Sequence, residues 1–175
     1  TMARADDGRT TLVEVKAVDD AYPLFGTVTL EPDMPLSALL ARSGDVFGAA
    51  ADPALLTRLD LKLGDRIAIG KATIELRSVL KNEPDRLSGG IGFGPRLLVS
   101  PDALRASALL QPGSLVRYGY RLRLPAGSAS DGALTAVENA ARATLPDAGW
   151  DIRTRKKASP QLERNVERFS QFLTL

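Results

Sequence analysis

The sequence contains neither cysteine nor histidine, and each absence excludes a class of chemistry. Without cysteine, the 175 residues can form no disulfide and offer no thiolate nucleophile or thiolate ligand. Without histidine, they lack the usual general base and the commonest nitrogen ligand for metals. Ser-His-Asp and Cys-His catalysis are therefore excluded within this chain, whereas the cellular compartment stays open.

Long apolar runs are also missing. No stretch of about 18 apolar residues occurs, so we expect no membrane span within these residues. The opening TMARADDGRTT lacks the apolar segment of a signal peptide, so any signal for export or membrane insertion is expected outside this chain. Lysine and arginine total 23 against 21 acidic residues, and the net charge of +2 is no nucleic-acid signature. Hydrophobic residues make up 44% and charged residues 25%, which is typical of a folded domain with a core.

Alternation of apolar and polar residues predicts strands through the first two thirds of the chain. The clearest signal is DRIAIGKATIELRSVL, residues 65–80, which predicts a hairpin that turns at its Gly-Lys pair and buries one face. In LVEVKAV, residues 12–18, Glu14 and Lys16 alternate with apolar residues, so their face is expected to be wet. Further strands are predicted over 28–30, 96–100 and 116–124.

Capping residues followed by proline predict three helices. Asp or Ser can accept an N-terminal N–H, while proline suits the first helical turn. Such pairs begin predicted helices over 53–59, over 101–107 and from 160 onward. LSALLARSG predicts a short helix that is ended by Gly44. A longer helix is predicted from Asp131, its expected cap, to Leu145.

The final predicted helix has an apolar stripe and no stop signal. Leu162, Val166, Phe169 and Leu173 recur at intervals of four, three and four, as on one face of an amphipathic helix. No Gly, Asn or Pro closes it before Leu175. The helix is therefore expected to continue beyond the last residue.

Composition changes at about residue 50 and again at about residue 127. The second change falls in PAGSASDG, residues 125–132, which has the composition of a flexible linker. The predicted fold class is therefore α+β, with a β-rich subdomain over 50–125 inserted into an α+β unit whose pieces lie on either side of it.

SGGIGFGP, residues 88–95, is the best candidate for a phosphate-binding loop, but its context is wrong. A dinucleotide-binding fingerprint follows a strand directly and opens a helix, whereas this segment follows a polar stretch and leads into a strand. A loop or bulge is therefore favoured over a ligand site. Its apolar residues Ile91 and Phe93 are candidates for contact with a partner. No Gly-x-Ser-x-Gly pattern supplies a serine nucleophile elsewhere.

Acidic pairs and basic residues have ordinary explanations. Asp6-Asp7 and Asp19-Asp20 are interpreted as turn or cap residues in preference to catalytic or Ca²⁺-binding carboxylates, because adjacent residues on a strand point to opposite faces. RTRKK, residues 153–157, is favoured as solvated surface, with lipid headgroups as the alternative contact. The arginines of the 116–124 strand are expected on its exposed face: Arg117, Arg121 and Arg123.

Several segments together resemble a known family. In chain order they are VEVKAVDDAYPLFG, LTRLDLKLGDRIAIG, LKNEPDR, GPRLLVSPDAL, LLQPGSLVRYGYRL and ERNVERFSQFLTL. The series resembles the extracytoplasmic domain of FtsX-like ABC transporter permeases with a MacB-type core, most closely the YbbP-type permeases. Each motif is weak alone, and their order and spacing make the match specific.

The resemblance implies an arrangement of subdomains. Residues 1–49 and 126–158 would form a Porter-like α+β subdomain, and residues 50–125 an inserted, mostly β Sabre-like subdomain. Residues 159–175 would form a stalk helix that leads towards a transmembrane helix, its apolar stripe packing against the domain or a neighbouring stalk. The resemblance also implies a preceding transmembrane helix and further Porter residues, whose absence leaves the VEVKAV strand short of a neighbour.

The resemblance further implies a function. The domain would be the periplasmic part of an inner-membrane permease and would relay ATP-driven conformational change to a periplasmic partner or a hydrophobic, lipid-like cargo. ATP would be hydrolysed by a separate cytoplasmic ATPase subunit, since no Gly-x-x-x-x-Gly-Lys-Ser/Thr loop occurs here. A periplasmic esterase or lysophospholipase is an implied partner, whereas no catalytic role, cofactor, metal or nucleic acid is expected. The alternatives are a free-standing soluble ligand-binding domain with a β-barrel-like site and, less favoured, a hydrolase without His or Cys.

Overall fold

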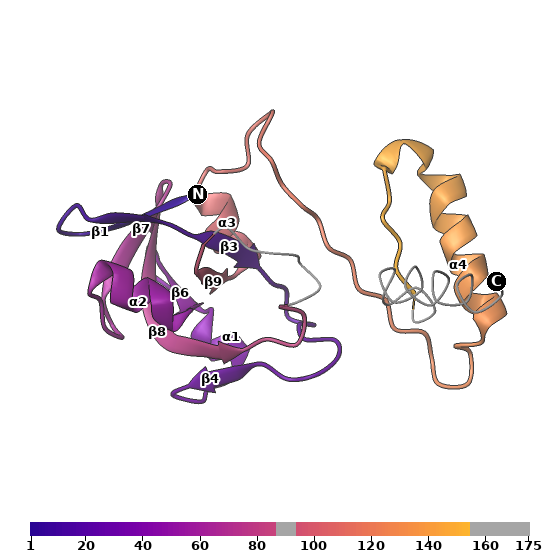
Figure 1. The fold of residues 1–175 in the computed structure, drawn as a ribbon, viewed down its shortest axis with the longest axis horizontal. Helices are drawn as coiled ribbons and strands as arrows, with labels where there is room; N and C mark the ends of the chain where they lie inside the picture. Colours follow the sequence, from indigo (N-terminus) through magenta and orange to yellow (C-terminus); the bar gives the residue numbers. More distant parts are fainter. Residues whose placement is uncertain (87–93, 155–175) are drawn as a thin grey trace, which may run out of the picture. The chain divides into compact units, whose positions relative to one another are not determined.

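The computed structural model describes residues 1–86 and 94–154 and has a mixed α+β fold (Figure 1). The chain divides into two compact units, Thr1–Arg121 and Leu122–Leu175, called unit 1 and unit 2 below. Across the described residues, no helix has both the length and the apolar character needed to cross a membrane.

Unit 1 is built on a nine-stranded sheet with the order β2-β1-β7-β8-β6-β9-β3, to which β4 adds at β8 and β5 at β6. Most neighbours are antiparallel, whereas β3 runs parallel to β9 and β6 parallel to β8. The strands are β1 Met2–Ala5, β2 Thr10–Leu12, β3 Glu14–Ala17, β4 Thr29–Glu31, β5 Arg42–Ser43, β6 Val46–Ala51, β7 Arg66–Ile69, β8 Ala72–Asn82 and β9 Arg96–Val99.

The two ends of this strand order are consecutive in the chain, so the sheet closes on itself. The Val13 N–H donates to the carbonyl of Thr1 at 2.8 Å and extends the β1–β2 pairing. One residue later, the Glu14 N–H donates to the carbonyl of Pro95 at 2.9 Å and begins the β3–β9 pairing. Closure brings Gly94 against this crossover, where an added Cβ would lie 2.7 Å from the Leu12 carbonyl oxygen. Only glycine allows the two backbones to approach this closely.

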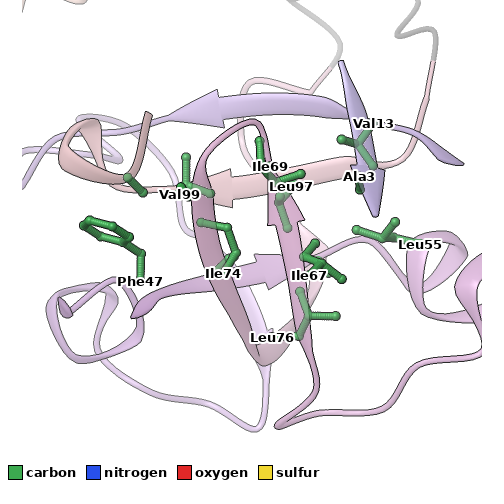
Figure 2. Packing of buried hydrophobic residues seen from close by; sticks show 14 of the residues in the cluster. Ala3, Val13, Phe47, Leu55, Ile67, Ile69, Ile74, Leu76, Leu97 and Val99 are labelled. Atoms are coloured by element: carbon green, nitrogen blue, oxygen red, sulfur yellow. The ribbon is translucent and has the colours of Figure 1, made fainter. Parts of the chain in front are cut away.

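The interior of the closed sheet is filled by apolar side chains. Val13, Ile67, Ile74 and Leu97 are each at most 2% exposed, and the labelled side chains of Figure 2 converge from several strands. The space beside Ile69 and Ile74 has no room for a water molecule. At this position the barrel-like interior is therefore filled by side chains. A second cluster covers the other face of the sheet: Val18, Leu30, Leu39, Ala50, Leu80 and Leu98.

The helices begin at or next to the capping residues that the sequence predicts. The helices are α1 Leu36–Leu39, α2 Pro53–Leu59, α3 Pro101–Ala106, α4 Asp131–Thr144 and the 3₁₀ helix η2 Pro146–Ala148. Asp52 caps α2 by accepting from the Ala54 N–H at 2.9 Å, and Ser100 caps α3, which confirms both predictions. In α4 the cap is Ser130 and not Asp131, because the Ser130 hydroxyl accepts from the Ala133 N–H at 3.2 Å.

The predicted hairpin is confirmed, since Ile69 pairs with Ala72 across a turn at Gly70 and Lys71. The predicted helix over 36–44 is wrong beyond Leu39. The Arg77 guanidinium donates to the carbonyls of Leu39 at 3.2 Å and Ala41 at 2.7 Å, so the chain leaves the helix there. Residues 42–43 then form β5, and Gly44, with φ of 59°, turns the chain into β6.

The predicted strand over 116–124 is also wrong, because none of these residues lies in a strand. Its alternating pattern needs a neighbouring strand and a core to cover its apolar face. The structure leaves those side chains exposed: Tyr118 is 68%, Tyr120 71% and Leu122 74% exposed.

Strands from both sides of residue 50 share the sheet of unit 1, so that position separates no compact units. The boundary between units follows Arg121, close to the compositional change at about 127. The α+β class is confirmed, while the Porter-like and Sabre-like assignments stay predictions.

Replacing Gly94 with alanine tests the closure of the sheet. The new Cβ would meet the Leu12 carbonyl, so we expect a loss of roughly 1–3 kcal/mol in the free energy of unfolding, measured by urea denaturation. Gly119→Ala is the matched control, because no atom lies within 4 Å of its added Cβ, and its effect should stay within about 0.5 kcal/mol. Equal effects of the two substitutions would contradict the closure.

Candidate functional site

Charged residues from distant segments meet at the carboxyl end of β8. The strand register places Glu14 directly beside Arg96, because β3 and β9 run parallel. Glu83 and Asp85 follow the last residue of β8. We call the whole set the ionic network: Glu14, Lys16, Tyr22, Glu83, Asp85, Arg96 and Arg121.

Glu83 is the buried centre of the ionic network, with its side chain 0% exposed. One carboxylate oxygen accepts from Lys16 Nζ at 3.0 Å, and the other accepts from Arg96 Nε at 2.9 Å. Arg96 also donates to Glu14 at 2.5 Å. A buried carboxylate is tolerated only when cations and hydrogen-bond donors compensate for its lost hydration, and these contacts supply both.

Asp85 joins the network to the surface. Its Oδ1 accepts from Lys16 Nζ at 2.6 Å and from the Tyr22 hydroxyl at 2.8 Å, while its Oδ2 accepts from Arg121 at 3.1 Å. Lys16 Nζ also lies 4.4 Å from the centre of the Tyr22 ring, a cation–π contact. The three cations Lys16, Arg96 and Arg121 thus offset the three carboxylates of the network.

The surroundings shift two pKa values. Burial alone would raise the pKa of Asp85, but hydrogen bonds from Lys16 and Tyr22 outweigh it and hold that pKa below its ordinary value of 3.8. Burial, followed by the hydrogen bond to Asp85, raises the pKa of Tyr22 far above its ordinary value of 10.0. Asp85 is therefore a carboxylate and Tyr22 a neutral donor at neutral pH.

A cavity of about 260 Å³ opens beside the network, and we call it the Tyr22 pocket. It is lined by residues 22–26, Pro84, Asp85 and Arg121. Gly26, with φ of 75°, lets the loop rest against Pro84, since an added Cβ would lie 2.6 Å from the Pro84 Cβ. Polar side chains of Tyr22, Asp85 and Arg121 and apolar residues of the 22–26 loop therefore line the pocket together, and the loop lies close against Pro84.

The predicted contact residues lie outside the described part of the chain. Ile91 and Phe93 fall in residues 87–93, and the stripe of Leu162, Val166, Phe169 and Leu173 falls in residues 155–175. Their roles stay predictions. Of the basic run, Arg153 pairs with Asp151 at 2.9 Å, and residues 155–157 are outside the described region.

Two of the acidic residues have the predicted turn role. Asp7 Oδ1 accepts from the Arg9 N–H at 3.0 Å, and Asp19 Oδ1 accepts from the Ala21 N–H at 3.2 Å. Within residues 1–86 and 94–154, no group of three or more acidic side chains is arranged to hold a metal ion.

A serine and a lysine on β8 have the Ser-x-x-Lys spacing used by some hydrolases. Ser78 donates to the carbonyl of Pro32 at 2.8 Å, whereas Lys81 pairs with Glu31 at 2.6 Å. Residues three apart on a strand point to opposite faces, so the lysine cannot serve as base for this serine.

The ionic network was missed by reasoning from sequence. Alternation placed Lys16 on a wet face, yet its side chain is only 20% exposed, because Glu83 and Asp85 cover it. The available signal was the set of motifs that carry the family resemblance. VEVKAVDDAYPLFG, LKNEPDR, GPRLLVSPDAL and LLQPGSLVRYGYRL contain all its members: Glu14, Lys16, Tyr22, Glu83, Asp85, Arg96 and Arg121.

Comparison with known proteins supports that resemblance. The chain is 31% identical over 165 residues to the uncharacterized ABC transporter permease YbbP of Escherichia coli (strain K12). The match covers 94% of this chain and 19% of that protein, so the chain spans about a fifth of the curated relative. No protein-family profile matches the chain, and no solved structure matches it. The chain is homologous to a segment of an ABC transporter permease, as predicted.

Replacing Lys16 with methionine tests the buried centre of the network. Glu83 would lose one of its two cations while staying buried, so we expect a loss of about 3–5 kcal/mol in the free energy of unfolding. The matched control is Lys81→Met, which removes the exposed pair with Glu31 and should cost less than about 1 kcal/mol. Comparable losses in urea denaturation would show that the network contributes no more than a surface pair.

The pH dependence of stability tests Asp85. Its folded pKa lies below the ordinary 3.8, so its contribution is present above that value and is lost as the pH falls through the folded pKa. Asp85→Asn should be less stable at neutral pH and should lose less stability than the unsubstituted chain on acidification below about pH 4. Urea midpoints measured from neutral pH down to strong acid would reveal this. Parallel curves for the two proteins would contradict the assignment.

Proposed function

We propose that this homologue of an ABC transporter permease forms the extracytoplasmic domain of such a permease, and that it relays ATP-driven conformational change to a periplasmic partner or a hydrophobic, lipid-like cargo. The main observation behind this proposal is that nearly the whole chain matches about a fifth of a permease. In this proposal, a separate cytoplasmic subunit hydrolyses ATP, and a periplasmic esterase or lysophospholipase is one class of partner.

The construction of unit 1 supports a mechanical role. A closed sheet with a filled interior deforms little, because displacing any strand opens voids in a densely packed core. The ionic network adds cross-links between β3, β9 and the segment after β8. A rigid body of this kind can transmit a displacement from one of its faces to another without dissipating it in internal rearrangement.

The use of buried polar groups supports a non-catalytic role. In the part of the chain that the structure describes, the buried polar side chains are Asp52, Ser78, Glu83 and Ser107. Asp52 caps α2 and pairs with Arg86 at 2.7 Å, while Ser107 donates to the Leu104 carbonyl at 2.6 Å. Ser78 and Glu83 have the partners given above, so each of these groups serves the fold.

Spin-label distances would test the relay. We would place cysteines at Thr73 in β8 and Asn139 in α4, which are both exposed, in the full-length permease assembled with its ATPase subunit in nanodiscs. Any native cysteines elsewhere in the complex would first be replaced. We further propose that the relay moves units 1 and 2 relative to one another, so ATP binding to a hydrolysis-deficient ATPase should shift the distance between these two labels.

The control pair is Asp33→Cys with Thr73→Cys, both in unit 1. Its distance should be the same with and without ATP, since unit 1 is expected to move as a body. Unchanged distances for both pairs would overturn the relay, and a change confined to the control pair would overturn the rigid-body account.

A further inference from the structure

We propose that the Tyr22 pocket is a docking site for a partner polypeptide segment that inserts one large apolar side chain beside an acidic residue. The inference rests on the proposed function, since it specifies the kind of partner that the relay would engage. It is carried by the size of the pocket, the chemistry of its walls and the sign of the charge at its rim.

The size of the pocket suits one large side chain of a partner. Its volume of about 260 Å³ is close to the lower end of the roughly 300–1,000 Å³ found for small-ligand pockets. A pocket of this size holds part of a larger partner, as when one anchor side chain fills a hot-spot pocket in a protein interface.

The walls favour an apolar anchor. Pro23, Leu24, Phe25 and Pro84 line the pocket, and Phe25 is 57% exposed. Aromatic residues and arginine are enriched in protein interfaces, and both occur here around a concave surface. The contact between Gly26 and Pro84 holds the loop in place, so binding of a partner side chain pays little entropy for ordering the loop.

The rim favours an acidic neighbour for that anchor. The Arg121 side chain is 51% exposed, whereas the Asp85 side chain that it pairs with is 16% exposed. Of the two paired groups, the guanidinium is therefore the more exposed. A carboxylate beside the anchor would complement it, and a lysine or arginine there would meet an unfavourable charge.

Photo-crosslinking with a defined peptide tests this site. The probe is an acetylated and amidated pentapeptide with photoleucine between two glutamates, applied to the full-length permease in nanodiscs. Mass spectrometry should place the crosslinks on residues that line the pocket, namely 22–26, 84–85 and 121. A matched peptide with lysines in place of the glutamates should crosslink on the order of fivefold less, because one charge pair is reversed.

Variants separate the apolar and charged contributions. Phe25→Ala and Arg121→Gln should each lower the crosslink yield on the order of fivefold, whereas Arg121→Lys should restore much of it. Arg123→Gln, two residues away and not part of the pocket lining, is the control and should keep the original yield. Thermal unfolding of each variant would verify that it folds, and Phe25 is exposed enough to be replaced without loss of the fold.

Three results would overturn the proposal. They are equal yields for the two peptides, crosslinks placed outside the pocket lining of residues 22–26, 84–85 and 121, and displacement of the peptide by a diazirine fatty acid that labels the same residues. The last result would assign the pocket to lipid. The ATP-dependent distances are measured without the peptide, so the relay and the docking site can fail independently.

Discussion

Burial of the Glu83 carboxylate is the constraint on which much of unit 1 depends. A carboxylate with 0% exposure is stable only while Lys16 and Arg96 remain beside it, and those residues lie on β3 and β9. Through Glu83, the ion pairs therefore link two parallel strands that are far apart in sequence. Loss of either cation would leave a desolvated charge, which costs more than the pair itself contributes.

The structure divides into features that could be predicted from sequence and features that could not. The caps at Asp52 and Ser100 and the hairpin turn at Gly70 depend on neighbouring residues, so local rules suffice. The ionic network depends on pairs such as Lys16 with Glu83, 67 residues apart, and Glu14 with Arg96, 82 residues apart. No local pattern encodes those separations. The alternating residues 116–124 likewise have the pattern of a strand, but a strand also needs a neighbouring strand to pair with, and the local sequence cannot show whether one is present.

The family resemblance carried information that the local patterns lacked. Its motifs are short and individually common, yet they contain the residues that form the network and line part of the Tyr22 pocket. Residues from four of these motifs therefore meet in space. The subdomain assignment that the same resemblance implies stays a prediction, while the sheet of unit 1 joins strands from both sides of residue 50.

Asp85 links the buried network to the surface pocket, and this determines how the pocket can work. One oxygen accepts from Lys16 and Tyr22, and the other accepts from Arg121 at the rim. The guanidinium is thereby held through Asp85 by the same cation that compensates Glu83. A rim charge positioned from the core is already oriented before a partner arrives, so binding need not order it. The closed sheet and the pocket are therefore linked by one set of ionic contacts. Loss of the contacts around Glu83 should also leave the Arg121 side chain less well ordered.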